Sequence, residues 1–196
     1  MFTGIVEEVG RITERAENRL WIRTERITED LGVGSSIAVD GVCLTVVALR
    51  HAEFAADLSP ATLHRTALGL RLPGDRVNLE RPVPAAGRVG GHFVQGHVDG
   101  VGRVVALRPD GEFAWMEISA PPEVVRYLVP RGSVAVDGVS LTVAGVEGER
   151  FSVCLIPYTL RHTTLGERRP GDPVNLEADI LAKYVERLVS GWRKTA

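Results

Sequence analysis

The sequence has few of the residues that form disulfide-linked or metal-binding folds. Only two of its 196 residues are cysteine, and aromatic residues make up 6% of the chain. Cys43 and Cys154 form no Cys-x-x-Cys pair, so neither a disulfide framework nor a zinc site is indicated. Few aromatic residues and a net charge of −2 also argue against the stacking platforms and basic groove that nucleic acid needs. We therefore expect no metal and no nucleic acid partner.

Long apolar runs are missing as well. No stretch approaches the roughly 18 residues of a membrane-spanning helix. The N-terminus, Met1-Phe2-Thr3-Gly4, lacks the basic and apolar regions of a signal peptide. Hydrophobic residues make up 44% of the chain and charged residues 24%, which is typical of an ordinary globular protein. These values predict no membrane partner and a cytoplasmic location.

What the chain does contain is one stretch that occurs twice. Val39–Val46 reappears as Val136–Val143, and the only difference is that Cys43 becomes Ser140. The same offset of 97 residues aligns 58–63 with 155–160 and 73–80 with 170–177, and an offset of 92 aligns 4–11 with 96–103. A period of about 90 residues is too long for a solenoid unit, which usually has about 20–50. The chain is therefore a duplicated domain.

Short strand patterns separated by turns recur in each repeat. In the first repeat we expect strands over 2–12, 20–24, 42–49, 54–58 and 75–80, with brief helices over 28–32 and 61–68. The second repeat adds a longer hairpin at 108–111 and a helix over 123–128. Many short, regularly spaced strands predict a small closed antiparallel barrel rather than a parallel sheet with crossover helices. The fold class is all-β.

One element after the second repeat has no counterpart in the first. Asp179 can cap a helix in which Leu181, Val185, Leu188 and Trp192 follow a spacing of four, three and four, as in a coiled-coil seam. A solitary helix this short is marginal in water, so it packs on its own barrel or on copies of itself. The seam favours copies of itself.

Three parts follow from these patterns. We expect an N-terminal barrel over 1–92, a C-terminal barrel over 93–178 and a C-terminal helix over 179–196. Residues 81–87, rich in proline with a closing glycine, suit neither a helix nor a central strand and are expected to link the barrels.

Each copy of the repeated stretch places polar side chains on one face of a strand. Side chains two residues apart share a face, so Cys43 lies with Thr45, and Ser140 lies with Thr142. The apolar residues between them point the other way, into the core. The polar face is where chemistry is expected.

Several motifs together resemble one known family. They are Met-Phe-Thr-Gly-Ile-Val at 1–6, Gly-Val-Cys-Leu-Thr-Val at 41–46, Gly-His-Val at 96–98, Asp-Gly-Val-Ser-Leu-Thr-Val at 137–143, Ile-Pro-Tyr-Thr-Leu at 156–160 and Asn-Leu-Glu-Ala-Asp-Ile at 175–180. These motifs resemble those of the riboflavin synthases, and the resemblance covers nearly the whole chain. It implies two six-stranded Greek-key barrels per chain and a homotrimer held by C-terminal helices.

The resemblance also implies a reaction. Two molecules of 6,7-dimethyl-8-ribityllumazine exchange a four-carbon unit and give riboflavin and 5-amino-6-(ribitylamino)uracil, without a metal or redox cofactor. The family places each site between the N-barrel of one subunit and the C-barrel of the next, where two facing pockets supply proximity and orientation. Whether the chain associates with lumazine synthase stays open.

The second repeat has a group that can transfer protons where the first repeat has an apolar one. His97 stands where the first repeat has Ile5, and the reaction begins with loss of a proton from the 7-methyl group. We expect His97 to assist, with Ser140 and Thr142 as its hydrogen-bonding partners in the C-barrel. The alternative is a histidine satisfied by backbone groups. His92 lies five residues away, on the opposite face of a strand, which argues against a shared metal.

Three further catalytic candidates each have a plainer alternative. Cys43 is either a nucleophile or acid/base group in the N-barrel or a small buried hydrophobe. Asp137 is either near the site, as the family implies, or only part of a turn. Asp179 is either an active-site carboxylate or a helix cap.

The resemblance implies a larger set of substrate contacts from both repeats. Thr62 and Thr159 are either ligand contacts or helix-local hydrogen bonders, Phe2 is either core or a lid, and Arg131 replaces a lysine that the family often has. The full set is Phe2, Gly4, Ile5, Val6, Cys43, Leu44, Thr45, Asp57, Leu58, Ser59, Pro60, Ala61, Thr62, Gly96, His97, Val98, Arg131, Ser140, Leu141, Thr142, Cys154, Leu155, Ile156, Pro157, Tyr158 and Thr159.

A non-catalytic binder is the strongest rival. Lumazine proteins are similar to this chain and serve as fluorescent carriers, but their second-repeat motifs are degraded. Here Gly96-His97 and Ser140-Leu141-Thr142 are intact, which favours the enzyme. A more remote rival is an unrelated small-barrel module that binds flavin or an oligonucleotide.

Overall fold

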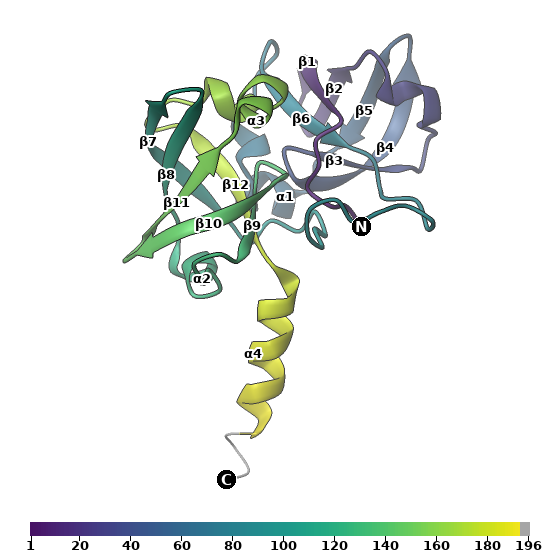
Figure 1. The fold of residues 1–196 in the computed structure, drawn as a ribbon. Coiled ribbons are helices and arrows are strands. Elements are labelled where there is room, and N and C mark those ends of the chain that lie inside the picture. Colours follow the sequence, from purple (N-terminus) through teal and green to yellow (C-terminus); the bar gives the residue numbers. More distant parts are fainter. Residues whose placement is uncertain (193–196) are drawn as a thin grey trace.

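Two closed six-stranded barrels form the body of the computed structural model, which describes residues 1–192 (Figure 1). The first barrel contains β1 (Glu8–Ala16), β2 (Arg19–Arg23), β3 (Ser36–Val39), β4 (Val42–Arg50), β5 (Glu53–Asp57) and β6 (Arg76–Glu80). The second contains β7 (Gly100–Asp110), β8 (Phe113–Ser119), β9 (Ser133–Val136), β10 (Val139–Glu147), β11 (Arg150–Leu155) and β12 (Pro173–Ala178). The helical elements are η1 (Ile27–Asp30), α1 (Pro60–Arg65), η2 (Ala67–Leu70), α2 (Pro122–Val125), α3 (Pro157–His162), η3 (Thr164–Glu167) and α4 (Ile180–Trp192).

The two barrels share one topology. Their strands follow the orders β1-β2-β5-β4-β3-β6 and β7-β8-β11-β10-β9-β12, in which a three-strand meander lies beside an earlier strand as in a Greek key. Even the register shifts recur, after Ile12 and Val46 in the first barrel and after Val104 and Val143 in the second. The predicted all-β fold with an internal duplication is therefore confirmed.

Each barrel is filled by its own apolar side chains. Along β4 the burial alternates, with Val42, Leu44 and Val46 buried and Thr45 exposed, as the period of a strand requires. A third, small apolar cluster lies apart from both interiors and contains Phe2, Ala38, Val94 and Ala135. Residues from both halves of the chain meet in this cluster, so it joins the two barrels.

The observed elements correct three of the predicted elements. The first strand begins at Glu8 rather than residue 2, because Phe2 leaves its own barrel and pairs with Val94 through two backbone hydrogen bonds of 2.7 and 3.1 Å. The predicted helix over 61–68 is split into α1 and η2 because Thr66 between them is extended, with φ −130° and ψ 160°. The helix predicted over 123–128 is the single short turn α2.

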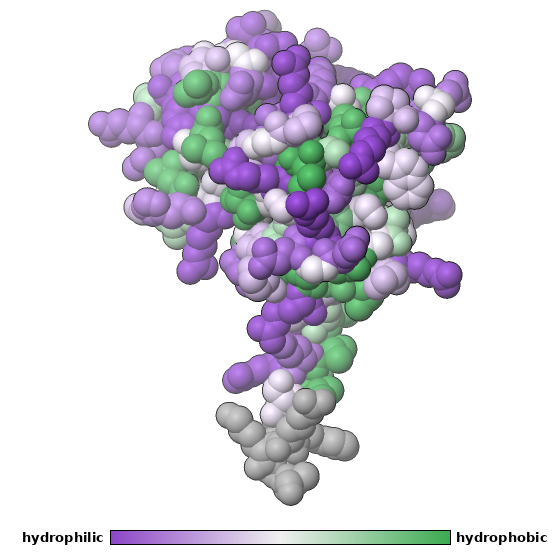
Figure 2. All heavy atoms as spheres, turned by 90° about the vertical axis from the view of Figure 1, so that its left-hand side faces the viewer, coloured by the Kyte–Doolittle hydropathy of each residue, from purple (hydrophilic) through white to green (hydrophobic). Residues whose placement is uncertain are grey.

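Helix α4 leaves the body of the molecule (Figure 1). One face is tied to the second barrel, because Lys183 Nζ lies 2.6 Å from Asp99 Oδ1 and Tyr127 donates to Glu186 over 2.6 Å. The opposite face is apolar and exposed, as the green side of the helix in Figure 2 shows, and contains Leu181, Tyr184, Val185, Leu188 and Val189. Of the predicted seam, the Trp192 side chain lies outside the described residues, as do 193–196. Within residues 1–192, no helix has both the length and the apolar character that crossing a membrane requires.

Candidate functional site

The two halves of the chain exchange their leading segments. The N-terminal segment crosses to the second barrel, where Gly4 O accepts a hydrogen bond of 2.8 Å from Ser140 N. Residues 96–98 cross to the first barrel, where Gly96 O accepts the equivalent 2.8 Å bond from Cys43 N. Gly4 and Gly96 have φ values of +76° and +80°, and a Cβ on either would lie 2.6 Å from the Cβ of Ser140 or Cys43. Only glycine permits this approach.

Two buried carboxylates hold these segments in place. Glu80 on β6 accepts from Thr3 N at 2.6 Å and Gly4 N at 3.0 Å. Glu177 on β12 accepts from Gln95 N, Gly96 N and His97 N at 2.7 to 2.9 Å. Burial raises the pKa of Glu177 to about 7, against the opposing effect of these N–H donors and of the Lys183 charge. Each carboxylate therefore fixes the backbone that passes beside Ser140 or Cys43.

On the second barrel, Ser140 pairs with a histidine. His92 Nδ1 lies 2.7 Å from Ser140 Oγ, and Nε2 of the same ring is buried without a hydrogen-bond partner among the described residues. Burial lowers the pKa of His92 and outweighs the charge of Asp179, which raises it. A neutral imidazole therefore faces the Ser140 hydroxyl and can exchange a proton with it.

The face around Ser140 combines residues from both ends of the chain. Thr142 projects from β10 beside Ser140, and Cys154 on β11 is half-buried next to it. Val6, from the crossed N-terminal segment, packs against the interior of the second barrel, and Ile5 before it is exposed. After β11, the exposed residue Ile156 directly precedes α3.

The equivalent face of the first barrel lies around Cys43. Thr45 projects beside Cys43 on β4, and Val98 of the crossed segment packs against the interior of this barrel. At one end of the face, Ser59 caps α1 and its Oγ lies 2.9 Å from Thr62 Oγ1. The two candidate sites therefore have the same plan but different reactive groups.

The structure does not bring His97 to Ser140, because His92 occupies the position beside the Ser140 hydroxyl. The His97 backbone N donates to Glu177, which holds this segment beside Cys43. The His97 side chain is exposed and makes no hydrogen bond within the described part of the chain. The repeat alignment places His97 opposite Ile5 in sequence, but each of the two residues lies on the other half's barrel. His92 is therefore the histidine that accompanies Ser140.

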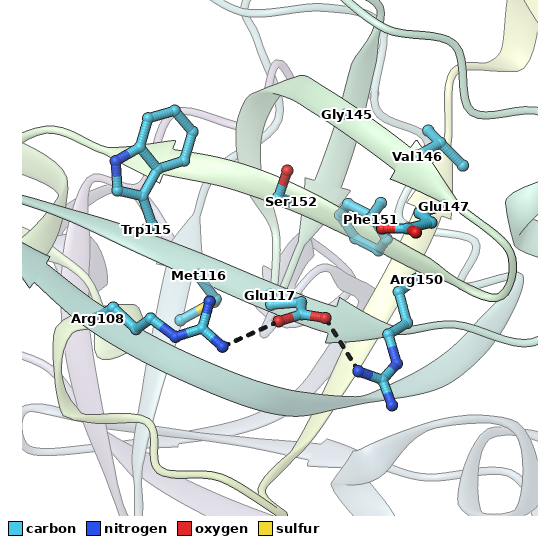
Figure 3. Close-up of a pocket in the computed structure, with 10 residues that line it drawn as sticks. All are labelled: Arg108, Trp115, Met116, Glu117, Gly145, Val146, Glu147, Arg150, Phe151 and Ser152. Atoms are coloured by element: carbon cyan, nitrogen blue, oxygen red, sulfur yellow. Dashed lines mark hydrogen bonds and ion pairs between the residues drawn. The ribbon is translucent and has the colours of Figure 1, made fainter.

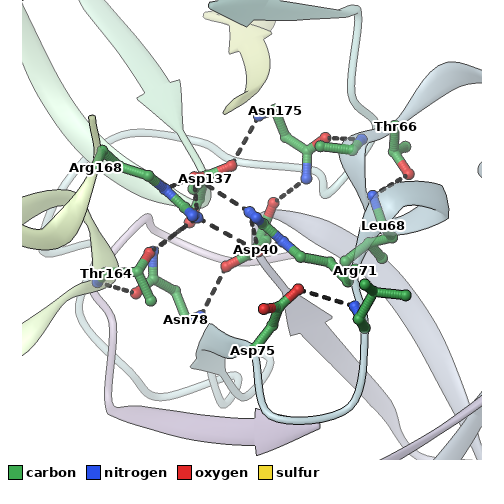
Figure 4. A network of polar contacts seen from close by, with 12 residues as sticks. Asp40, Thr66, Leu68, Arg71, Asp75, Asn78, Asp137, Thr164, Arg168 and Asn175 are labelled. Carbon is green, nitrogen blue, oxygen red and sulfur yellow. Dashed lines mark hydrogen bonds and ion pairs between the residues drawn. The ribbon is translucent and has the colours of Figure 1, made fainter. Parts of the chain in front are cut away.

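A buried polar network links the two barrels at the turns that precede β4 and β10 (Figure 4). Arg71 donates to Asp40 at 2.8 and 3.0 Å, and Arg168 donates to Asp137 at 2.7 and 3.1 Å. Each guanidinium also lies 3.8 Å from the other aspartate, so four charges form one cluster. Both aspartates have no exposed surface, and burial together with the Asp137 charge raises the pKa of Asp40 to about 6.

Two asparagines complete this network. Asn78 donates to Asp137 O at 2.9 Å, and Asn175 donates to Asp40 O at 2.8 Å. Next to them, Gly41 and Gly138 touch, since a Cβ on either would lie within 2.7 Å of the other backbone nitrogen. Asp40 and Asp137 directly precede these glycines, so the network fixes the start of β4 and β10, the strands that carry Cys43 and Ser140.

Several predicted contact residues do not present their side chains to solvent. Leu44, Leu58, Leu141 and Leu155 point into the barrel interiors, and Phe2 has no exposed surface. Phe2 therefore fits the core alternative rather than a lid. For the leucines, only the backbone is left to contact a ligand.

Other predicted contact residues have a structural role. Asp57 forms a two-pronged ion pair with Arg19 at 2.6 and 2.9 Å. Asp179 accepts from Leu181 N at 3.0 Å and so caps α4, and its charge also reaches His92. The side chain of Arg131 is exposed in a turn, where its backbone has φ +70°. Pro60 and Pro157 begin α1 and α3.

Several residues of the candidate sites and of the network between the barrels were not predicted from the sequence. They include His92, Arg71, Arg168 and the carboxylates Glu80 and Glu177. A signal existed for the carboxylates, because Asn-Leu-Glu at 78–80 recurs at 175–177 and places buried polar groups on an otherwise apolar strand. No repeat or periodicity marked His92.

Known proteins that resemble this chain in sequence include riboflavin synthases, and one that resembles it in structure binds riboflavin. The family model for the lumazine binding domain matches residues 3–82 and 95–179. Riboflavin synthase of Mycobacterium tuberculosis (strain ATCC 25618 / H37Rv) is 51% identical over 197 residues, which cover 96% of this chain and 98% of the relative. Riboflavin synthase of Bacillus subtilis (strain 168) is 39% identical over 193 residues, covering 96% and 90%. LumP complexed with riboflavin has a TM-score of 0.85 at 25% identity, covering 91% of this chain and 99% of LumP.

Proposed function

Because this chain belongs to the riboflavin synthase family, with two lumazine-binding domains, we propose that it converts two molecules of 6,7-dimethyl-8-ribityllumazine into riboflavin and 5-amino-6-(ribitylamino)uracil. The chain is thus an enzyme of the transferase class. One observation carries the proposed reaction. Two faces with a common plan carry different reactive groups, Cys43 on one and the Ser140–His92 pair on the other. A carrier for one ligand needs no such pair.

The reaction itself explains a use for two unlike faces. Both substrates are the same molecule, but one gives up a four-carbon unit and the other receives it. Two similar pockets that face each other would hold both molecules in a reactive orientation and make the step effectively unimolecular. We place each active site between the N-barrel of one subunit and the C-barrel of the next. The exposed apolar face of α4 supports a homotrimer that brings these barrels together.

Proton transfer is assigned to the second barrel. The first step removes a proton from the 7-methyl group of one lumazine, and Ser140 Oγ relays it to His92, whose lowered pKa keeps the ring neutral and ready to accept it. Thr142 lies beside Ser140 and helps to orient the ring. Cys43 and His97 contact the second lumazine on the first barrel, where the His97 side chain is exposed.

The direct test of this proposal is turnover. Purified protein incubated with 6,7-dimethyl-8-ribityllumazine should produce riboflavin and 5-amino-6-(ribitylamino)uracil in equal amounts, followed by absorbance and chromatography. The reaction should run without added metal or redox cofactor. Tight binding of the lumazine without riboflavin would contradict the proposal and identify a carrier. The same assay in cell extract fractions tests the expected cytoplasmic location.

Helix α4 gives a second prediction. Leu188 is 72% exposed on its apolar face, so Leu188→Asp should leave each chain folded but separate the trimer into monomers. If each site needs two chains, riboflavin formation should fall by roughly 100-fold, the scale expected when proximity is lost. Light scattering after size exclusion gives the mass, and Ser190→Asp on the opposite side of the helix is the control. A Leu188→Asp protein with unchanged mass and rate would exclude this assembly.

A further inference from the structure

A cavity of about 420 Å³ opens on the outer face of the second barrel (Figure 3). It is lined by β8, β10 and β11, and by the end of β7. In the register of the sheet, Trp115 lies directly opposite Cys154, and Ser152 lies between Gly145 and Glu117. The cavity therefore begins where the Ser140, Thr142 and Cys154 face ends, and Trp115 stands at the boundary.

Trp115 is fixed but uncovered. Its Nε1 donates to Asp110 Oδ2 at 3.0 Å, and 41% of the residue is exposed. Trp21 in the first barrel differs, because the Arg50 guanidinium lies over its ring at 4.0 Å. Among the described residues, no aromatic or cationic side chain stacks on Trp115. An immobilised indole with a free face is a good stacking surface for a flat ring.

The charges around the cavity do not favour an anion. Glu117 lies between Arg150 at 3.1 Å and Arg108 at 3.5 Å, as the dashed lines in Figure 3 show, and Glu147 adds a second negative charge. With Asp110 beside Trp115, three negative and two positive side chains surround the cavity, so they give no net attraction for a phosphate. The lining instead suits an uncharged ligand with hydrogen-bonding groups.

The first barrel has no equivalent of this arrangement. In its register, the position of Trp115 is taken by Arg19 and that of Cys154 by Asp57, and these two residues form an ion pair. An aromatic surface on one barrel thus corresponds to a closed pair of charges on the other. This difference in side chains lies at the edge of both candidate faces, so we expect the two faces to prefer different ligands.

We propose that this cavity is a subsite for a flat, uncharged heteroaromatic ring bound on the second barrel, and that Trp115 stacks on that ring. The identity of the ring as a lumazine or flavin rests on the proposed function. Trp115 then favours the larger tricyclic product on this barrel, because an additional ring increases the stacked area. The Arg19–Asp57 pair gives the first barrel no such preference.

Binding of riboflavin to the complete protein tests this subsite without chemistry. Calorimetric titration of the parent should resolve the sites of the two barrels. Trp115→Ala and Trp115→Leu should each weaken one class of site by about tenfold, because the ring that stacks on the ligand is lost. Trp115→Phe should stay within about threefold of the parent, and Trp21→Phe should change neither class. Thermal unfolding identifies any variant that fails to fold.

Several outcomes of the titration would overturn the proposal that Trp115 stacks on the ligand. Trp115→Leu binding as tightly as the parent would overturn the stacking proposal, because leucine keeps apolar bulk but has no ring. Equal weakening of both classes would also overturn it, since Trp115 lies on one barrel. Riboflavin production by the parent together with unchanged binding by the Trp115 variants would reject this inference alone. A parent that neither binds riboflavin nor forms it would reject the proposed function as well.

Discussion

Replacing Ser140 by alanine should lower kcat by roughly 10²- to 10³-fold, the usual contribution of a positioned proton-transfer group. The Ser140 hydroxyl is 2.7 Å from His92 Nδ1, and this is its only side-chain partner in the described part of the chain. Removing the hydroxyl breaks the relay and leaves His92 Nδ1 without its partner in a buried ring. The free energy of unfolding should therefore fall by about 1–3 kcal/mol, the cost of one unsatisfied buried polar group. Steady-state riboflavin formation and urea unfolding measure the two quantities.

The partner of Ser140 can be identified by a double substitution. If the proton passes from Ser140 to His92, Ser140→Ala and His92→Asn should each lose most of the rate, and the double variant should lose little more. His97→Asn lies on the other barrel and should multiply its effect with that of Ser140→Ala. Additive losses for Ser140 with His92, or a shared loss for Ser140 with His97, would show that the relay has been assigned to the wrong histidine.

Replacing Asp137 by alanine should destabilise the protein by about 3–5 kcal/mol, the cost of leaving a buried charge without its partner. Arg168 would lose both hydrogen bonds to Asp137 Oδ2, and Asn175 N would lose its 2.8 Å acceptor. Since a domain is typically stable by about 5–15 kcal/mol, much of its stability would disappear. Urea unfolding gives the loss directly.

An exposed ion pair provides the control for this measurement. Glu14 lies 3.3 Å from Arg50 and both side chains are about half exposed, so Glu14→Ala should cost less than about 1 kcal/mol. Asp137→Ala combined with Arg168→Met should recover part of the stability, because the orphaned charge is removed. A loss below 1 kcal/mol for Asp137→Ala would contradict the structural role. A normal unfolding curve together with lost activity would instead favour the catalytic role.

The fold was largely predictable because its determinants are local and repeated. The alternation around Cys43 and Ser140 fixed which side chains face outwards, and the offset of 97 residues fixed the order of the elements. The exchange of leading segments was not predictable from the alignment of 4–11 with 96–103. The alignment shows that the two segments are equivalent, but it does not show which barrel each of them contacts. His92 was assigned to a strand by its spacing from His97, whereas the structure has no strand over 92–98 apart from the bridge at Val94.

The exchanged segments have the contact symmetry of a dimer. Each barrel takes its closing glycine, Gly4 or Gly96, from the opposite half, and the Asp40 and Asp137 clusters are related by the same two-fold axis. Two-fold, self-complementary contacts of this kind are what two identical chains form when they associate. A homodimer of a single repeat has the same symmetry as these contacts, and residues 81–87 join both repeats in one polypeptide. In one polypeptide the two halves carry different groups at equivalent positions, cysteine at 43 and serine at 140, which two identical chains would not.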